Sequence, residues 1–141
     1  MPDATDKGRS LLALTAVVAS RVQIQGIRLS RSLASSALPA PGTSLRIDFG
    51  FNGEATADRE SNRIAVRASL RVRANVAEGA DSPAPAFQIE GEFLLDYRIS
   101  AFEEISDEQV AAFGKMNGIY NAWPYWREYV QSMTARMGFI D

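Results

Sequence analysis

The sequence predicts an α+β fold: an N-terminal helix, a four-stranded antiparallel sheet and C-terminal helices, in that order along the chain. Two observations lead to this prediction. Apolar residues recur at helical spacing near both ends of the chain, and between these regions they alternate with polar residues in four separate segments. With 141 residues and no visible repeat, the chain is expected to form one domain, residues 1–141, with a helix over 8–21, the sheet over 22–98 and helices over 106–138.

The N-terminal segment has two interpretations. Residues 11–20 form an apolar run preceded by Lys7 and Arg9, as in a short secretory signal peptide, but acidic residues dilute the positive charge before the run. The run is too short to span a bilayer. Apolar residues recur there at helical spacing: Leu11, Leu14, Val17, Val18 and Val22. We therefore favour an amphipathic helix that packs on its own domain or on a sister subunit.

The first two predicted strands are joined by a small, proline-rich crossover loop over residues 34–44. In the first strand the apolar positions change parity after Gly26, which predicts a bulge or a twist at this glycine. The second strand alternates over residues 45–51, and Asn52-Gly53 is expected to close it in a polar loop.

The third and fourth predicted strands each have one apolar and one charged face. The apolar face of the third consists of Ile64, Val66, Ala68, Leu70, Val72 and Ala74. That of the fourth consists of Phe87, Ile89, Phe93, Leu95 and Tyr97. Arginines occupy the other face of the third strand, and acidic residues that of the fourth.

The charges are unevenly distributed, because residues 1–75 carry a net charge of +5 and residues 76–141 one of −7. A basic half is typical of nucleic-acid-binding proteins. However, four arginines on the third strand beside three acids on the fourth would neutralise each other, and the arginines lack interleaved aromatic residues that could stack on bases. We favour cross-strand pairing and expect no nucleic acid partner; a nucleic-acid-binding or regulatory module that uses the arginine face is the alternative.

The last forty residues predict two helices joined by a loop. Ser106 and Gln109 form a capping box that opens a short helix to about Gly114. A loop over residues 115–122 then leads to Trp123-Pro124, where proline suits a first helical turn. The face of the second helix consists of Trp126, Tyr129, Val130, Met133 and Met137, and Gly138 is expected to end it.

The composition lacks two of the side-chain types that many enzymes use for catalysis. The chain has no cysteine and no histidine, which excludes disulfides, thiolate chemistry, cysteine zinc sites and the commonest general base. Two acidic pairs, Glu103-Glu104 and Asp107-Glu108, flank a helix N-terminus, where the helix dipole favours them without a metal. We expect no enzyme activity, no catalytic residue, no metal site and no cofactor.

The C-terminal helix carries the most specific motif in the chain. Its segment Trp123-Pro124-Tyr125-Trp126-Arg127-Glu128, followed by Arg136 and Gly138-Phe139, resembles the signature of the SecB family of protein-export chaperones. The resemblance covers about residues 22–139, with pattern agreement alone outside this helix. The family pattern continues with a proline-containing segment and a second helix, whereas this sequence ends at Asp141.

The resemblance implies an ATP-independent holdase, a cytoplasmic homo-tetramer (a dimer of dimers) that holds unfolded polypeptides or preproteins in apolar grooves and does not insert into membranes. Seven of the chain's thirteen aromatic residues lie within 113–139, as a groove edge requires. The residues that we expect to bind polypeptide are Phe49, Phe51, Phe87, Ile89, Tyr120, Trp123, Tyr125, Trp126 and Tyr129. Core and subunit packing is the alternative role for several of these side chains.

One departure from the export-type members concerns the partner. Those members present acidic residues on the sheet to the SecA motor, whereas this chain has arginines on its first and third strands: Arg28, Arg31, Arg63, Arg67 and Arg71. We therefore do not expect SecA to dock. The sequence looks more like the SecB-like chaperones that accompany toxin–antitoxin systems, which implies an antitoxin as a possible partner.

Overall fold

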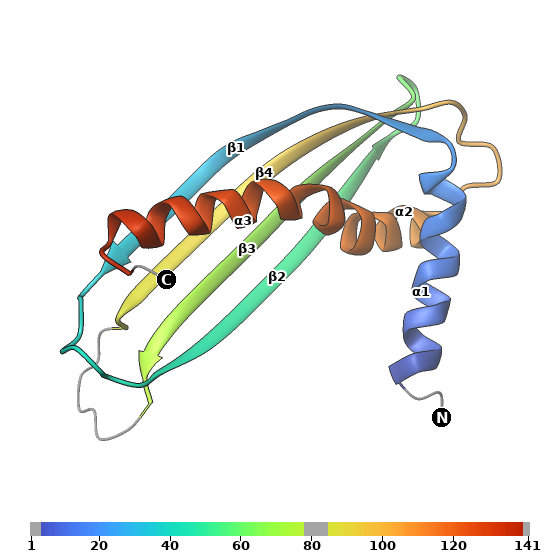
Figure 1. Cartoon of the computed structure of the whole chain (residues 1–141). Helices are drawn as coiled ribbons and strands as arrows, with labels where there is room; N and C mark the ends of the chain where they lie inside the picture. The colour runs from blue at the N-terminus through green and yellow to red at the C-terminus, as the bar shows by residue number, and fades with distance from the viewer. Residues whose placement is uncertain (1–3, 78–84, 140–141) are drawn as a thin grey trace.

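The computed structural model describes residues 4–77 and 85–139, with side chains described from residue 10 onward. Helices and strands follow in the predicted order along the chain (Figure 1). Their bounds are α1 Ala4–Ala19, β1 Val22–Ser36, β2 Leu45–Asp58, β3 Arg63–Val76, β4 Phe87–Ile99, α2 Asp107–Phe113, η1 Gly114–Gly118 and α3 Ile119–Arg136.

The sheet is antiparallel throughout, with the strand order β1-β4-β3-β2, so β1 and β2 form its two edges. The chain crosses from one edge to the other between β1 and β2. The helices α2 and α3 lie on one side of the sheet, which we call the helix face; the other side is the open face (Figure 1). The predicted fold class is confirmed.

The core lies between the helix face and the C-terminal helices. Every apolar residue predicted to share a face of β3 or of β4 is buried on this side, and the residues between them on β3 are exposed. Tyr97 on β4 packs edge-on against Phe113 of α2, with 4.8 Å between the ring centroids. The alternation of apolar and polar residues could be recognised in the sequence because both strands are central and each has only one face covered by helices.

Strand β1 contains two irregularities. Its register against β4 shifts between Ile24 and Gly26, as the change of parity at the glycine predicted, and again between Leu29 and Arg31. At the second shift the Ser30 hydroxyl donates to the Glu92 backbone carbonyl, 3.1 Å away. This second bulge was not predicted.

The expected turn at Asn52-Gly53 is wrong. Strand β2 continues through these residues to Asp58, and the turn lies at residues 59–62, where Asn62 has a φ of 55°. Gly53 is buried in the strand because the backbone carbonyl of Gly114 occupies the space that a Cβ would need. The Asn52-Gly53 pair is a turn signal in the sequence, but the glycine is needed here for the close contact between β2 and the backbone at Gly114.

The expected loop over 115–122 is also wrong. The helix continues from α2 through the π-turn η1 into α3, and Pro124 lies inside α3 rather than in a first turn. Gly118 fits into this turn because a Cβ there would lie 2.5 Å from a methyl carbon of Val66. Pro124 has no N–H group, so it cannot donate the usual helical hydrogen bond to the backbone carbonyl of Tyr120, four residues earlier. Tyr120 is exposed.

Both predicted ends of the helical region are confirmed. Ser106 and Gln109 form the reciprocal capping box, with distances of 2.8 and 3.1 Å. At the other end Gly138 has a φ of 95°, and the amide of Phe139 donates to the carbonyl of Thr134 at 2.9 Å. This is the Schellman arrangement that glycine favours after a helix.

Helix α1 packs on the rest of the domain through its C-terminal half, where Thr15 and Val18 are buried beside α2, while its N-terminal turns extend away from the sheet (Figure 1). Arg21 fixes the helix end by donating to the carbonyls of Ala101 and Glu103. No helix in the described part of the chain has the length and apolar character needed to cross a membrane.

The contact between Gly53 and Gly114 predicts that Gly53→Ala destabilises the fold. A new Cβ would collide with a backbone carbonyl, which cannot rotate away, so we expect a loss of about 1–3 kcal/mol in the free energy of unfolding, measured by urea denaturation. Gly26→Ala on β1 is the matched control, because a Cβ added there would have no atom within 4 Å. Equal stabilities of the two variants would contradict this account of the β2–helix contact.

Candidate functional site

An apolar row on β2 remains uncovered by the helices. Ile47, Phe49 and Phe51 lie on the helix face, paired in register with Ala74, Val72 and Leu70 of β3. Those β3 partners are buried, but Phe49 is 73% exposed and Phe51 62%. The reason is the course of α3, which begins near β2 and crosses toward β4 and β1 (Figure 1). The outer part of β2 therefore presents large apolar side chains to solvent.

Helix α3 adds aromatic side chains on both of its flanks. Asn121 points toward β4, where it accepts a hydrogen bond of 2.7 Å from the Tyr97 hydroxyl. Trp123 lies two residues further, about 200° around the helix, and so on the other flank, with Tyr120 one turn before it. Tyr120 is 75% exposed and Trp123 45%. Tyr125 lies on the Asn121 side and is also exposed.

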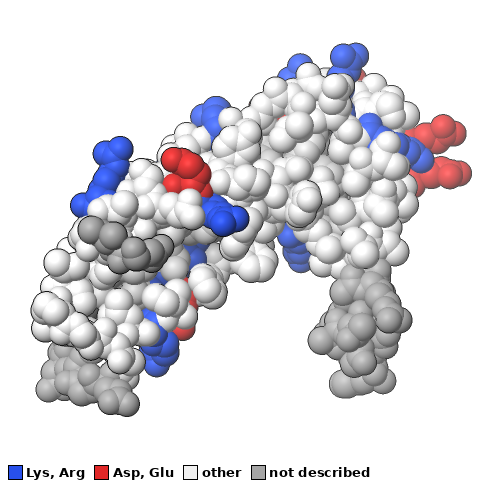
Figure 2. Space-filling model, viewed as in Figure 1, with Lys and Arg blue, Asp and Glu red and all other residues white. Residues whose placement is uncertain are grey.

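These five side chains, Ile47, Phe49, Phe51, Tyr120 and Trp123, form what we call the β2–α3 surface. They lie on the same side of the sheet. Figure 2 shows that uncharged atoms predominate on this side of the molecule, with a few charged side chains among them. Several large apolar side chains exposed on one side of a sheet are uncommon on a protein that has no partner, so the surface is the candidate site.

Three interactions hold α3 against the sheet. Trp126 is 5% exposed and lies over Gly91, where a Cβ would be only 3.0 Å from the indole ring. Phe139 packs edge-on against Phe87 at 5.1 Å. The third is a pair of hydrogen bonds to Asn121 Oδ1, one donated by the Tyr97 hydroxyl and the other by the side-chain amide of Asn117 at 3.1 Å. Burial raises the pKa of Tyr97, so its hydroxyl keeps the proton that it donates to Asn121.

The structure divides the nine residues expected to bind polypeptide into two groups. Phe87, Ile89 and Trp126 lie in the core, where they support the sheet and α3. The other six have solvent-accessible side chains: Phe49, Phe51, Tyr120, Trp123, Tyr125 and the half-buried Tyr129. Tyr129 packs against the core at 6.3 Å from Trp126 and lies with Tyr125 on the flank facing away from the β2 row.

Sequence reasoning did not include Ile47 in the site. It continues the alternation of Phe49 and Phe51 on the same face of β2, and this spacing could have identified it. Asn117 and Asn121 gave no signal, because only the packing of α3 on the sheet brings them to Tyr97.

The acidic residues at the start of α2 serve local structure. Asp107 accepts from Arg59 at 2.9 Å, and within the described residues no group of three or more potential ligand side chains could hold a metal ion. Of the expected pairs between β3 arginines and β4 acids, the described part of the sheet contains Arg67 with Glu92 at 3.3 Å, whereas Arg71 and Arg73 form no ion pair there.

Comparison with known proteins supplies the family. No family model matches the chain. The SecB-like chaperone Rv1957 of Mycobacterium tuberculosis (strain H37Rv) is 31% identical over 152 residues, an alignment that covers 97% of this chain and 84% of that protein. The chain belongs to the SecB-like chaperones. The SecB-like chaperone MT2006 from strain CDC 1551 matches with the same identity and coverage.

A solved structure agrees with the fold of this SecB-like chain. It contains the Rv1957 SecB-like chaperone of M. tuberculosis in complex with a ChAD peptide from the Rv1956 HigA1 antitoxin. The two folds superpose with a TM-score of 0.77 at 27% identity, over 92% of this chain and 93% of the other.

The burial of the two tryptophans predicts a clear difference between their alanine variants. Trp126→Ala should lower the free energy of unfolding by about 3–5 kcal/mol, because it empties a core position over Gly91. Trp123→Ala should cost less than about 1 kcal/mol, because this side chain is half exposed. Urea denaturation followed by far-UV circular dichroism measures both, and similar losses for the two variants would refute the assignment of Trp123 to the surface.

Proposed function

We propose that this SecB-like chain is an ATP-independent holdase that binds unfolded polypeptide segments on the β2–α3 surface. One observation carries the proposal: the apolar row of β2 is exposed on the same side of the sheet as Tyr120 and Trp123. Tyr125 and Tyr129 extend the binding area along the other flank of α3.

The chemistry of this surface suits a binder of varied sequences. Unfolded clients expose apolar side chains and extended backbone, and both can be accommodated by aromatic side chains beside a sheet edge. Large rings contribute much apolar area without requiring a specific hydrogen-bond pattern, so binding is permissive. Without histidine or cysteine the chain has few groups for acid–base or nucleophilic catalysis, which supports holding rather than chemistry.

The proposed client is the aggregation-prone segment of an antitoxin, in a toxin–antitoxin context rather than in general protein export. The complex of the related Rv1957 chaperone with an antitoxin peptide supports this choice. The arginines Arg28, Arg31, Arg63, Arg67 and Arg71 occupy the open face, which argues against the SecA docking of export-type members.

The proposed working form is a cytoplasmic homo-tetramer. Two features support self-association. The edge strand β1 exposes Ile24, Leu29 and Leu33, and the projecting helix α1 exposes Leu12. Apolar side chains on an unpaired edge and on an extended helix are typical of surfaces that a second copy covers.

The client-binding proposal predicts selective loss of holding. Phe49→Ala and Trp123→Ala should each weaken suppression of the aggregation of a chemically unfolded client several-fold without nucleotide, because each removes an exposed anchor. Light scattering at near-stoichiometric chaperone measures the effect. Leu38→Ala is the matched control, because it removes a 64% exposed apolar side chain outside this surface and should leave suppression unchanged. Full suppression by both site variants would refute the proposal.

The assembly proposal predicts a defined mass. Native mass spectrometry of the purified chain should give a tetramer, and addition of an unfolded polypeptide should give a tetramer–client complex. A monomer that still binds client would disprove the tetramer alone, whereas a tetramer that binds no client would disprove holding.

A further inference from the structure

The open face of the sheet carries charged side chains from all four strands. Arg63, Arg67, Arg71 and Arg73 project from β3, and the β4 residues facing them in register include Glu90, opposite Arg71. Strand β1 adds Arg28 and Arg31, and β2 adds acidic residues such as Asp48. The helices lie on the other side of the sheet, so the β2–α3 surface uses none of these charged side chains.

Most of the acids on this face have local partners. Glu92 is held by Arg67 at 3.3 Å and by the Ser30 hydroxyl at 3.1 Å, and its side chain is 21% exposed. Asp48 accepts from Asn75 at 3.3 Å and lies 3.7 Å from Arg46. Glu54 accepts from Asn52, and Glu90 from Gln88.

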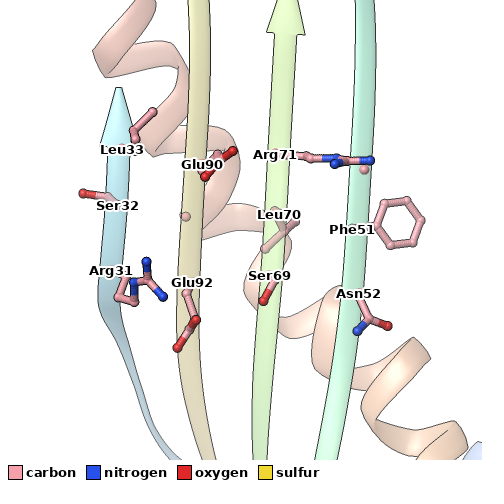
Figure 3. Close-up of a pocket in the computed structure, with 12 residues that line it drawn as sticks. Arg31, Ser32, Leu33, Phe51, Asn52, Ser69, Leu70, Arg71, Glu90 and Glu92 are labelled. Carbon is pink, nitrogen blue, oxygen red and sulfur yellow. The ribbon is translucent and has the colours of Figure 1, made fainter. Parts of the chain in front are cut away.

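The arginines at the centre of the face are not neutralised in this way. Within the described residues the ion pairs involve Arg46, Arg59 and Arg67, and none involves Arg31, Arg71 or Arg73. Arg73 donates to the neutral Gln88 at 3.1 Å. Arg71 extends over Gly50 of β2, whose missing side chain leaves room for the guanidinium (Figure 3).

These arginines border two adjoining depressions in the face. The larger, of about 540 Å³, has Arg31 on one side and Arg71 on the other, with Ser69, Asn52 and Glu90 between or beside them (Figure 3). The second, of about 440 Å³, shares Arg71 and Glu90 with the first and adds Arg73. Together they provide guanidinium donors around a hollow that also offers hydroxyl and amide groups, and Leu33 and Phe51 add apolar side chains to the larger depression.

We propose that the open face is a second docking surface, which binds an acidic peptide segment in an extended conformation through Arg71, Arg73 and Arg31. Arg71 and Arg73 are two residues apart on one strand, so their bases are separated by roughly 7 Å. Alternate side chains of an extended peptide have the same repeat. The two guanidinium groups lie on either side of β3, Arg71 over Gly50 of β2 and Arg73 at Gln88 of β4. Two carboxylates separated by one residue, in a peptide lying along β3, can each reach one of these groups, which bind carboxylates in a two-pronged geometry.

The acids of the same face determine which anion fits. Glu90 lies opposite Arg71 and Glu92 opposite Arg31, and the face as a whole carries nearly balanced charges. A continuous polyanion such as a nucleic acid would meet these carboxylates at each step, and its affinity depends on neutralising many phosphates. A peptide with spaced carboxylates avoids them. The occupant is therefore an acidic protein segment, and apart from Phe51, which borders both surfaces, its binding leaves the helix face free for a client.

The test uses a fluorescently labelled peptide of alternating glutamate and threonine, about as long as β3, and fluorescence anisotropy at low salt. We expect saturable binding, and much weaker binding of the same peptide with glutamine in place of glutamate. The double variant Arg71→Glu/Arg73→Glu should weaken binding roughly tenfold or more, because it reverses two charges at the site. Arg127→Glu on α3 makes the same kind of charge change on the helix side and should alter binding by less than about twofold.

Several outcomes would overturn the proposal: no binding of the glutamate peptide, equal binding of the glutamine peptide, or equal weakening by Arg127→Glu. Tighter binding of a single-stranded DNA of comparable length would assign the face to polyanions instead. The milder pair Arg71→Gln/Arg73→Gln, with an unchanged melting temperature, keeps the test valid if charge reversal disturbs the sheet. Client holding should be unaffected in these variants, so failure here and failure of the holdase proposal are distinguishable.

Discussion

The rest of the structure depends on the close contact between Gly53 of β2 and Gly114 at the start of η1. The two backbones approach so closely that neither position accommodates a side chain: a Cβ on Gly114 would lie 2.8 Å from the Cβ of Ala55. This contact fixes one end of α3 over β2, and the packing of Phe139 on Phe87 fixes the other end over β4. Between these two points the helix must cross the sheet obliquely. The outer part of β2 is left uncovered as a geometric consequence.

The course of α3 also determines what the exposed surface contains. Trp126 and Asn121 are used to hold the helix, one by burial over Gly91 and one through the Tyr97 hydroxyl. The positions between them on the helix surface, including Tyr120 and Trp123, are then free to face solvent. The π-turn places the beginning of α3 in this orientation, and glycine at 118 is required because Val66 lies directly beneath it. The proposed client-binding surface is thus a product of tertiary packing rather than of one motif.

This dependence explains how far the sequence could predict the molecule. Strands β3 and β4 were predictable because each alternates between a covered and an open face. Asn52-Gly53 and the segment from Gly114 to Gly118 were misinterpreted, because glycine is a turn former locally but is required here for close contacts between strand and helix. The same limit applies to the site. Spacing places Trp123 and Trp126 on one helix, but the packing of α3 decides that Trp126 is buried and Trp123 half exposed.

The two sides of the sheet have different chemistry because the register between β2 and β3 is fixed. With Phe49 opposite Val72 and Gly50 opposite Arg71, apolar side chains share the helix face and charged ones share the open face. A shift of β2 by one residue would bring Asp48, Gly50 and Asn52 to the helix face and Phe49 to the open face. Such a shift would also replace Gly53 beneath the Gly114 carbonyl with Asn52 or Glu54, neither of which fits. The contact between Gly53 and Gly114 directs α3, and it therefore also keeps the apolar row of β2 on the helix face and the arginines on the open face.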